Sequence, residues 1–383
     1  MNEQGHEKQS ETVVSGIVVK KAIPMEPAKI QRIPKLNPRN AEYFNNTEIQ
    51  EPEPIIDNIL YPGLGILGAP NKFGKSYTVL LLCCDVATGD PFLGFQIKRP
   101  GRVLYLDLEG TEARTKKRLS KIGFPVMPEK LHIQYKDNVR TIDQGLLEQL
   151  SEWMKDNPDT ILICIDMWKN VIGRTGRSED SYTATNRMLT PLQAFAIKHN
   201  ISVFITLHTR KGNTGYTPDD PFENITGSNA QFGTADCGWM LLGRRDEPNK
   251  RFVVLCRDND EGQQEFEVTF ENFRYKIIGT HEELQKERER IEYDNNPVVF
   301  TIKAMLENND TWIVTSSELR TTILLKTGES FEGKNIGTML DRKLKYLLGK
   351  YDNIMIIPPS KNGGIKGRKY TFKKRKLNQK PFI

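Results

Sequence analysis

Three consecutive residues, Gly74, Lys75 and Ser76, have the types and the order needed to hold a polyphosphate. A glycine lets the backbone approach the phosphates, a lysine ammonium reaches their oxygens, and a serine hydroxyl ligates Mg²⁺. The apolar run from Leu64 predicts a strand before this triplet, and segment 78–86 predicts a helix after it. This order is typical of a phosphate-binding loop (P-loop), where amide N–H groups and a helix N-terminus face the anion. The alternative is a chance Gly-Lys-Ser in a surface loop.

One position departs from the usual P-loop pattern. Ala69 stands where the pattern has its first glycine, and Gly68 lies one residue early. The loop must therefore turn with conformations that an alanine adopts, helped by the fixed φ of Pro70. We expect the nucleotide to contact one continuous segment: Ala69, Pro70, Asn71, Lys72, Phe73, Gly74, Lys75, Ser76 and Tyr77.

Polar side chains also end three of the predicted buried strands. Glu109, Asp166 and His208 each follow an apolar run, and ligands bind at the carboxyl ends of strands in open α/β sheets. Glu109 is placed to polarise the attacking water, Asp166 to hold Mg²⁺ together with Ser76, and His208 to sense the γ-phosphate. The alternatives are a solvated strand-end acid, a turn-forming aspartate and a solvent-facing imidazole.

Composition excludes several classes of protein. No apolar run in the 383 residues approaches the roughly 20 residues of a membrane span, and the N-terminus lacks the features of a signal peptide. We therefore expect a cytoplasmic protein without a membrane partner. The five cysteines are odd in number and show no C-x-x-C spacing, which favours buried thiols over metal ligands or disulfides.

The order of predicted elements indicates several parts. Strands that alternate with helices predict an α/β, mostly parallel sheet with helices on both faces. Polar, proline-rich sequence precedes it, and a change of character follows it. We predict a disordered arm at 1–54, the α/β domain at 55–280, a charged linker at 281–296, a winged-helix domain at 297–375 and a basic tail at 376–383.

The C-terminal part has the element order of a winged helix: three helices and then a hairpin with a basic tip. Between residues 361 and 380 there are nine Lys or Arg and no acid, a composition that suits a DNA phosphate backbone. The alternative is a solvated tail on a small interaction domain. Candidate DNA contacts in this part are Arg342, Lys343, Lys366, Arg368 and Lys369.

Taken together, residues 55–280 resemble the RecA-like ATPases, and more narrowly the RepA-type hexameric replicative helicases of plasmids and mobile elements. The resemblance rests on segments in a shared order: 68–76, 103–109, 163–166, 203–211, 227–230 with Asp236 downstream, and 255–258. It implies ATP and Mg²⁺ as ligands and a ring of subunits.

The resemblance also implies further roles for single residues. Arg257 would be the arginine finger that enters a neighbour's site, with Arg210, Arg244 and Arg245 as rivals. Loops 167–183 and 212–233 would line the channel. The expected contacts with single-stranded DNA are Lys169, Arg174, Arg177, Arg210 and Lys211.

The function expected from these features is that of an ATP-driven, ring-forming DNA helicase or translocase. It would act in the replication of a plasmid, phage or other mobile element, with a replication initiator or primase as a further partner. Two alternatives remain open. One is an ATP-controlled regulator that binds duplex DNA, and the other is a recombinase-like protein without unwinding activity.

Overall fold

The computed structural model describes residues 36–124, 127–174, 180–209, 221–224, 230–244, 246–359 and 369–375. The chain divides into two units, 1–51 and 52–383. In the first unit, α1 (Ala41–Asn46) begins at Asn40, whose side chain accepts a hydrogen bond from the Tyr43 N–H. This short helix lies within the predicted arm at 1–54. Residues 1–35 of that arm lie outside the described residues.

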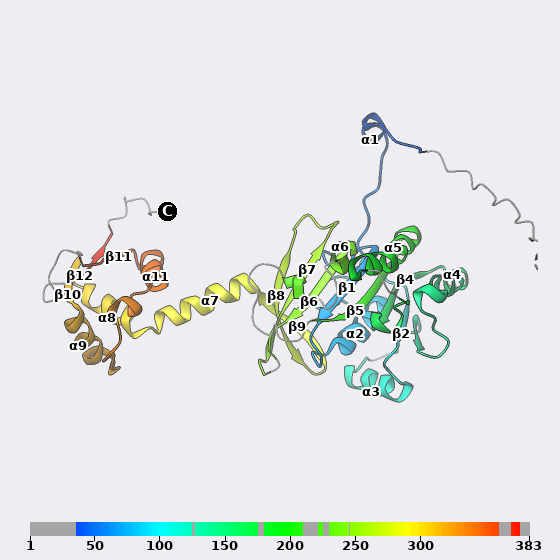
Figure 1. The fold of residues 1–383 in the computed structure, drawn as a ribbon. Coiled ribbons are helices and arrows are strands. Elements are labelled where there is room, and N and C mark those ends of the chain that lie inside the picture. The colour runs from blue at the N-terminus through cyan, green and yellow to red at the C-terminus, as the bar shows by residue number, and fades with distance from the viewer. Residues whose placement is uncertain are drawn as a thin grey trace, which may run out of the picture. The chain divides into compact units, whose positions relative to one another are not determined.

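The second unit contains a nine-stranded sheet, which confirms the predicted mostly parallel α/β fold (Figure 1). The strand order within the described residues is β3-β2-β4-β5-β1-β6-β7-β8-β9. The first six strands in this order, β3, β2, β4, β5, β1 and β6, run parallel to one another. Strands β7, β8 and β9 extend the sheet, each antiparallel to the strand before it. Their bounds are β1 (Gly63–Ala69), β2 (Arg102–Asp107), β3 (Leu131–Tyr135), β4 (Thr160–Asp166), β5 (Ser202–His208), β6 (Cys237–Leu242), β7 (Asn249–Cys256), β8 (Gln264–Glu271) and β9 (Arg274–Thr280).

Helices cover both faces of this sheet (Figure 1). On one face, α2 (Lys75–Thr88) and α3 (Glu112–Ile122) enclose an apolar core that includes Tyr105 and Phe204. On the other, α4 (Leu146–Asp156) and α5 (Ser181–His199) enclose a second core with Ile66 and Ile165. The central parallel strands β1, β2, β4 and β5 are buried on both faces, so they are mostly apolar and most of their polar side chains lie near the strand ends.

Short helices occupy several of the connections. They are η1 (Ile142–Gln144), η2 (Trp168–Asn170), η3 (Pro221–Asn224) and α6 (Ala230–Thr234). Edge strand β3 was not predicted, because its five residues alternate with polar side chains and its pattern is shorter than those of its neighbours. Among the described residues, no helix combines the length and apolarity needed to cross a membrane.

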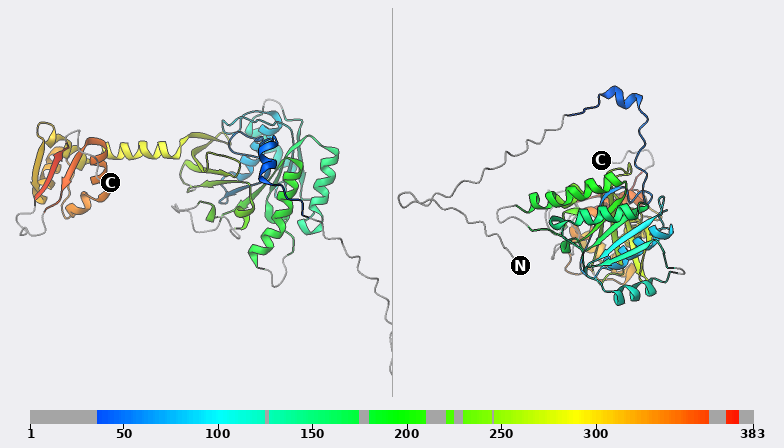
Figure 2. Two further views of the ribbon diagram at one scale, coloured as in Figure 1. Left: turned by 90° about the horizontal axis from the view of Figure 1, so that it is seen from above. Right: turned by 90° about the vertical axis from the view of Figure 1, so that its right-hand side faces the viewer.

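The C-terminal part has its own apolar core and a three-stranded antiparallel sheet of order β10-β12-β11 (Figure 2). Its elements are α7 (His281–Asp294), α8 (Pro297–Leu306), β10 (Thr311–Thr315), α9 (Ser316–Thr327), α10 (Ile336–Met339), α11 (Arg342–Asp352), β11 (Ile354–Ile357) and β12 (Lys369–Lys374). Strand β10 was not predicted. Between residues 336 and 352 the chain forms two helices, because the Asp341 side chain accepts from the Leu344 N–H and begins α11 anew.

A buried carboxylate joins α7 to strand β8. Glu267 accepts hydrogen bonds from Arg288 and from His281 Nδ1, the latter at 3.1 Å. Both partners lie on α7, so the predicted charged linker is a helix with a fixed anchor on the sheet. A capping box formed by Thr315 and Glu318 starts α9.

Candidate nucleotide-binding site

The P-loop connects β1 to α2, as the sequence predicts, and it turns at residues other than the expected ones. Ala69 remains in the strand, while Lys72 (φ +66°) and Gly74 (φ +75°) take the left-handed conformation. A Cβ on Gly74 would lie 3.3 Å from the Phe270 ring. A glycine at position 74 therefore avoids both backbone strain at this angle and a tight contact with the Phe270 ring. The missing first glycine does not prevent the turn, because Ala69 is not at the bend.

Lys75 lies buried inside the loop that it follows. Its ammonium donates to the Ala69 carbonyl at 2.6 Å and lies 2.9 Å from His208 Nδ1. Loss of solvation lowers the pKa of Lys75 to about 8, although Asp166 and Glu109 partly oppose this effect. A phosphate group entering the loop would supply the negative charge that this ammonium lacks.

His208 ends β5, and its backbone is paired with Ala69 of β1. Burial and the neighbouring cations Lys75 and Lys169 lower the pKa of the imidazole. The ring is therefore neutral near pH 7, and Nδ1 accepts the hydrogen bond from the Lys75 ammonium. A side chain at the end of β5 thus touches Lys75 of the P-loop directly.

Asp166 ends β4 and is fixed by two hydroxyl groups. Its carboxylate accepts from Thr206 Oγ1 at 2.6 Å and from the Tyr105 hydroxyl at 3.0 Å. Ser76 lies half-buried in the first turn of α2. A carboxylate and a hydroxyl are oxygen ligands of the kind Mg²⁺ prefers when phosphate and water complete its shell. The described residues contain no cluster of three or more His, Cys, Asp or Glu that could hold a metal ion.

Glu109 lies two residues beyond the end of β2, because the strand stops at Asp107 and not at the predicted residue 109. There the Leu108 N–H donates to the Asp166 carbonyl at 2.8 Å and turns the chain. The Glu109 carboxylate forms an ion pair with Lys169 at 2.7 Å, which lowers its pKa. Lys169, predicted as a channel-loop contact with DNA, therefore lies next to the predicted catalytic acid.

Asp107 is a buried acid that the sequence reasoning missed. Its carboxylate accepts from Thr115 Oγ1 at 3.0 Å and pairs with Arg118 at 3.5 Å, which ties α3 to the end of β2. Burial raises the pKa of Asp107, and the two partners oppose that shift. The Leu-Asp-Leu-Glu sequence at 106–109 offered the signal, since two acids follow one strand.

An aromatic cluster beside the P-loop was also missed. The Tyr77 ring stacks on Phe273 at 5.2 Å between centroids, and the Tyr275 hydroxyl donates to the Phe73 carbonyl at 2.6 Å. Phe270 completes the cluster. Because three of these rings belong to the β8–β9 hairpin, nearly 200 residues away in the sequence, only the fold brings them to the loop.

Arg257 lies where the parallel strands begin, at the edge of the sheet opposite the carboxyl ends that carry the P-loop. It follows β7, which ends with Cys256 paired to Cys237 at the start of β6. Its guanidinium pairs with Asp236 at 3.2 Å and donates to the Gly233 carbonyl at 2.7 Å. The Asp236 carboxylate also accepts from the Leu64 N–H at 2.8 Å, near the start of β1. About 16 Å of strand separates Leu64 from the P-loop, so Arg257 does not serve the phosphate site of its own chain.

The remaining predicted contacts are scattered. The Arg174 backbone N–H is held by Asp143 at 3.0 Å, and the Arg244 guanidinium pairs with Asp246 at 3.3 Å. Neither residue joins the P-loop cluster. The predicted residues that lie outside the described part of the chain are Arg177, Arg210, Lys211, Arg245, Lys366 and Arg368.

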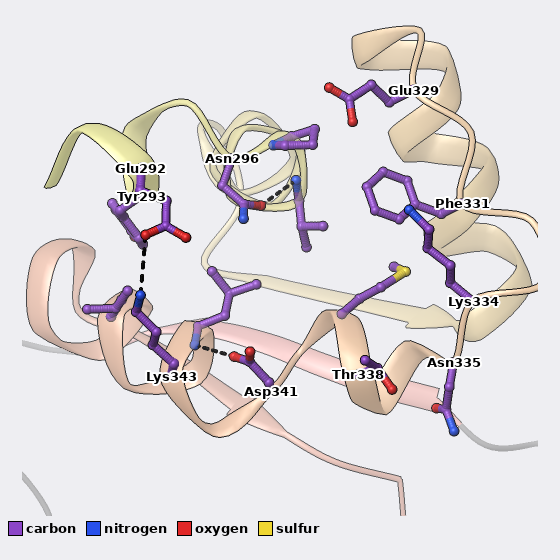
Figure 3. A pocket seen from close by; sticks show the side chains of 15 residues that line it. Glu292, Tyr293, Asn296, Glu329, Phe331, Lys334, Asn335, Thr338, Asp341 and Lys343 are labelled. Atoms are coloured by element: carbon purple, nitrogen blue, oxygen red, sulfur yellow. Dashed lines mark hydrogen bonds and ion pairs between the residues drawn. The ribbon is translucent and has the colours of Figure 1, made fainter. Parts of the chain in front are cut away.

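In the C-terminal part, Arg342 and Lys343 open α11 and Lys369 opens β12. Lys343 pairs with Glu292 of α7 at 3.3 Å, at the side of a groove of about 490 Å³ (Figure 3). Arg342 is exposed. The groove is lined by residues of the C-terminal part, such as Tyr293 and Met339, and by none of the P-loop residues.

A comparison with protein families matches the part of the chain that contains the P-loop. Residues 32–214 match the model of a family described as "AAA domain". Among curated proteins, none matches the sequence. A solved structure whose title describes it as an "ATPase Domain" is similar at 11% identity, with a TM-score of 0.44, over 57% of this chain and 85% of that one. The family match and the P-loop geometry together support a P-loop ATPase domain in this part of the chain.

Proposed function

We propose that the protein is an ATP-hydrolysing DNA helicase or translocase. The observation that carries this proposal is the meeting of Lys75, His208, Asp166 and Glu109 at the carboxyl ends of adjacent strands, around a P-loop. Such a set provides a phosphate-binding cation, a magnesium ligand, an acid for the attacking water and a sensor that touches the cation. It suits phosphoryl transfer from ATP to water.

In this reaction each residue has one task. Lys75 would exchange its contact with the Ala69 carbonyl for the β- and γ-phosphates, and Ser76 and Asp166 would hold Mg²⁺, which neutralises phosphate charge when bound. Glu109 would orient water and accept its proton. Because His208 now accepts from the Lys75 ammonium, movement of that lysine onto a phosphate would free the imidazole to contact the γ-phosphate. The end of β5 would then report the state of the nucleotide.

We further propose that Arg257 completes the site of a neighbouring subunit. Its place at the far edge of the sheet and its half-exposed side chain, 54% accessible, support a role in trans. Positive charge supplied to the γ-phosphate from outside would make hydrolysis depend on assembly. A hexameric ring, a role in replicating a plasmid, phage or other mobile element, and an initiator or primase as partner rest on the sequence resemblance alone.

The C-terminal part is proposed to be a winged-helix DNA-binding domain, with limits at 297–375. Its order of α8, β10, α9, α10, α11, β11 and β12 and its antiparallel sheet support this proposal. On α11, the exposed Arg342 and Lys345 lie three residues apart on one face, while Lys343 and Lys350 pair with acids of α7. We therefore favour Arg342 over Lys343 as a DNA contact.

Strand displacement tests the proposal. With ATP, the wild-type protein should displace a strand from a forked duplex, and Lys75→Ala should abolish displacement. Lys117→Ala, which removes an exposed lysine from α3, is the matched control and should behave as the wild type. Glu109→Gln should bind ATP and hydrolyse it at least about 100-fold more slowly. ATP-dependent binding to duplex DNA without displacement would favour the regulator, and helical filaments on single strands the recombinase-like alternative.

A further inference from the structure

We propose that Lys169 is a positioning residue that holds Glu109 away from the attacking water until a phosphate of single-stranded DNA takes Lys169 as its partner. The inference rests on the proposed function and adds a link between the DNA strand and hydrolysis. It begins with the ion pair between Lys169 Nζ and the Glu109 carboxylate, 2.7 Å apart.

The two residues are brought together by neighbouring strands. Glu109 follows β2 and Lys169 follows β4, and the last residues of these strands, Asp107 and Asp166, are paired in register. The backbone on both sides is fixed. The Leu108 N–H donates to the Asp166 carbonyl, and η2 is anchored by the buried Trp168. The side chains of the ion pair are therefore free to move while the backbone that carries them is not.

The pair itself is easily exchanged. The Lys169 and Glu109 side chains are 53% and 47% accessible to solvent, and ion pairs with this exposure shift an equilibrium only about two- to fivefold. A DNA phosphate, which brings a full negative charge to the same ammonium, is a strong competitor for it. We favour single-stranded DNA as the partner of Lys169, because Arg174, five residues later, adds a second cation to the same segment of the chain.

Release of the pair would change the chemistry of Glu109. While the pair is intact, the ammonium stabilises the ionised carboxylate, so the pKa of Glu109 is lowered and it is a weaker base. Once Lys169 has turned to a phosphate, the carboxylate oxygen that it held becomes available to the water that attacks the γ-phosphate. Hydrolysis would then be slow on the free protein and faster on the protein that holds DNA.

The test compares Lys169→Met and Lys169→Arg in ATP hydrolysis, with and without an oligothymidine strand. Lys169→Met should raise the DNA-free rate about two- to fivefold and lose most of the stimulation by the strand. Lys169→Arg keeps a cation opposite Glu109 and should preserve both. Lys155→Met breaks a similar exposed Lys–Glu pair on α4, between Lys155 and Glu152 at 2.6 Å, and should change neither rate.

Two further readouts separate positioning from structure. In Lys169→Met, the acidic limb of the pH–rate profile should move to higher pH, because Glu109 loses the cation that lowers its pKa. Binding of the labelled strand should lose about 0.7 from its log–log salt slope. A DNA-free rate in Lys169→Met equal to or below the wild type would overturn the inference while leaving the ATPase intact. Absence of hydrolysis by the wild type would overturn the proposed function as well.

Discussion

The two edges of the nine-stranded sheet carry charge in different ways. At the edge formed by the carboxyl ends of β1, β2, β4 and β5, charged groups face a P-loop: Lys75 has lost its solvation and Glu109 has a partner that exchanges easily. At the opposite edge, Asp236 is saturated by a backbone N–H, by Gln193 at 2.7 Å and by Arg257. The first edge thus holds a buried cation and an exposed ion pair beside the P-loop, whereas at the second edge the charges are paired with one another and Arg257 is half-exposed.

This difference distinguishes residues available for ligand binding from residues that stabilise the fold. Buried polar groups whose hydrogen bonds are all made stabilise the fold, and their removal costs stability. Groups whose partners are poor or exposed are free to take a ligand. Variants at the two edges should therefore affect different measurements, and the predictions that follow use this contrast.

The largest effect is expected for Arg257→Ala. Loss of a trans-acting arginine should slow hydrolysis about 1,000-fold in the assembled protein. Loss of its ion pair should cost about 1–2 kcal/mol of unfolding free energy, because the buried Asp236 keeps its bonds to the Leu64 N–H and Gln193. Steady-state hydrolysis and denaturant unfolding measure the two quantities. Mixing Arg257→Ala with Lys75→Ala should restore part of the activity, because some interfaces then combine an intact P-loop with an intact arginine. A mixture no faster than its components would refute a role in trans.

A smaller effect, and on stability alone, is expected for Asp236→Ala. The variant leaves the Leu64 N–H and the Gln193 amide without their acceptor, so unfolding free energy should fall by about 2–4 kcal/mol. Urea denaturation followed by circular dichroism measures this loss. Asp246→Ala, at an exposed ion pair, is the control and should change stability by less than about 0.5 kcal/mol. Equal losses in both variants would mean that the Asp236 network does not hold the edge.

The smallest effect concerns the pH dependence of nucleotide binding. The pKa of Lys75 is lowered to about 8 by burial, and a bound phosphate would raise it. Binding therefore takes up a proton above pH 8, so ADP affinity should be steady below pH 8 and fall by up to about tenfold per unit above it. Calorimetry from about pH 6.5 to 9.5 tests this, and Lys75→Met should show no such fall. A parallel fall in Lys75→Met would assign the titration to another group.

The sequence predicted the positions of those candidate site residues that directly follow an apolar strand in the chain. The P-loop, Asp166 and His208 lie at the ends of strongly apolar strands, and such strands are recognised without knowledge of their neighbours. The end of β2 was predicted two residues too late, because the apolar Leu108 continues the pattern while its backbone already pairs with Asp166. A pattern of side chains does not reveal where the backbone changes partner.

The missed features all depend on pairing between distant segments. The Tyr77–Phe273 stack needs the β8–β9 hairpin to reach the P-loop, and the Glu109–Lys169 pair needs β2 and β4 to be neighbours. Glu267, which looks like any strand acid in the sequence, is buried because α7 brings Arg288 and His281 to it. These contacts follow from strand order and register, which a single sequence does not determine.

The central claim is that the edge around Lys75 binds a nucleoside triphosphate. Calorimetric titration of the wild-type protein with a non-hydrolysable ATP analogue and Mg²⁺ tests it most directly, alongside Lys75→Met and the Lys117→Ala control. We predict saturable binding by the wild type and the control, and at least about 100-fold weaker binding by Lys75→Met. A wild-type protein that does not bind the analogue, or equal affinity in all three proteins, would contradict the account.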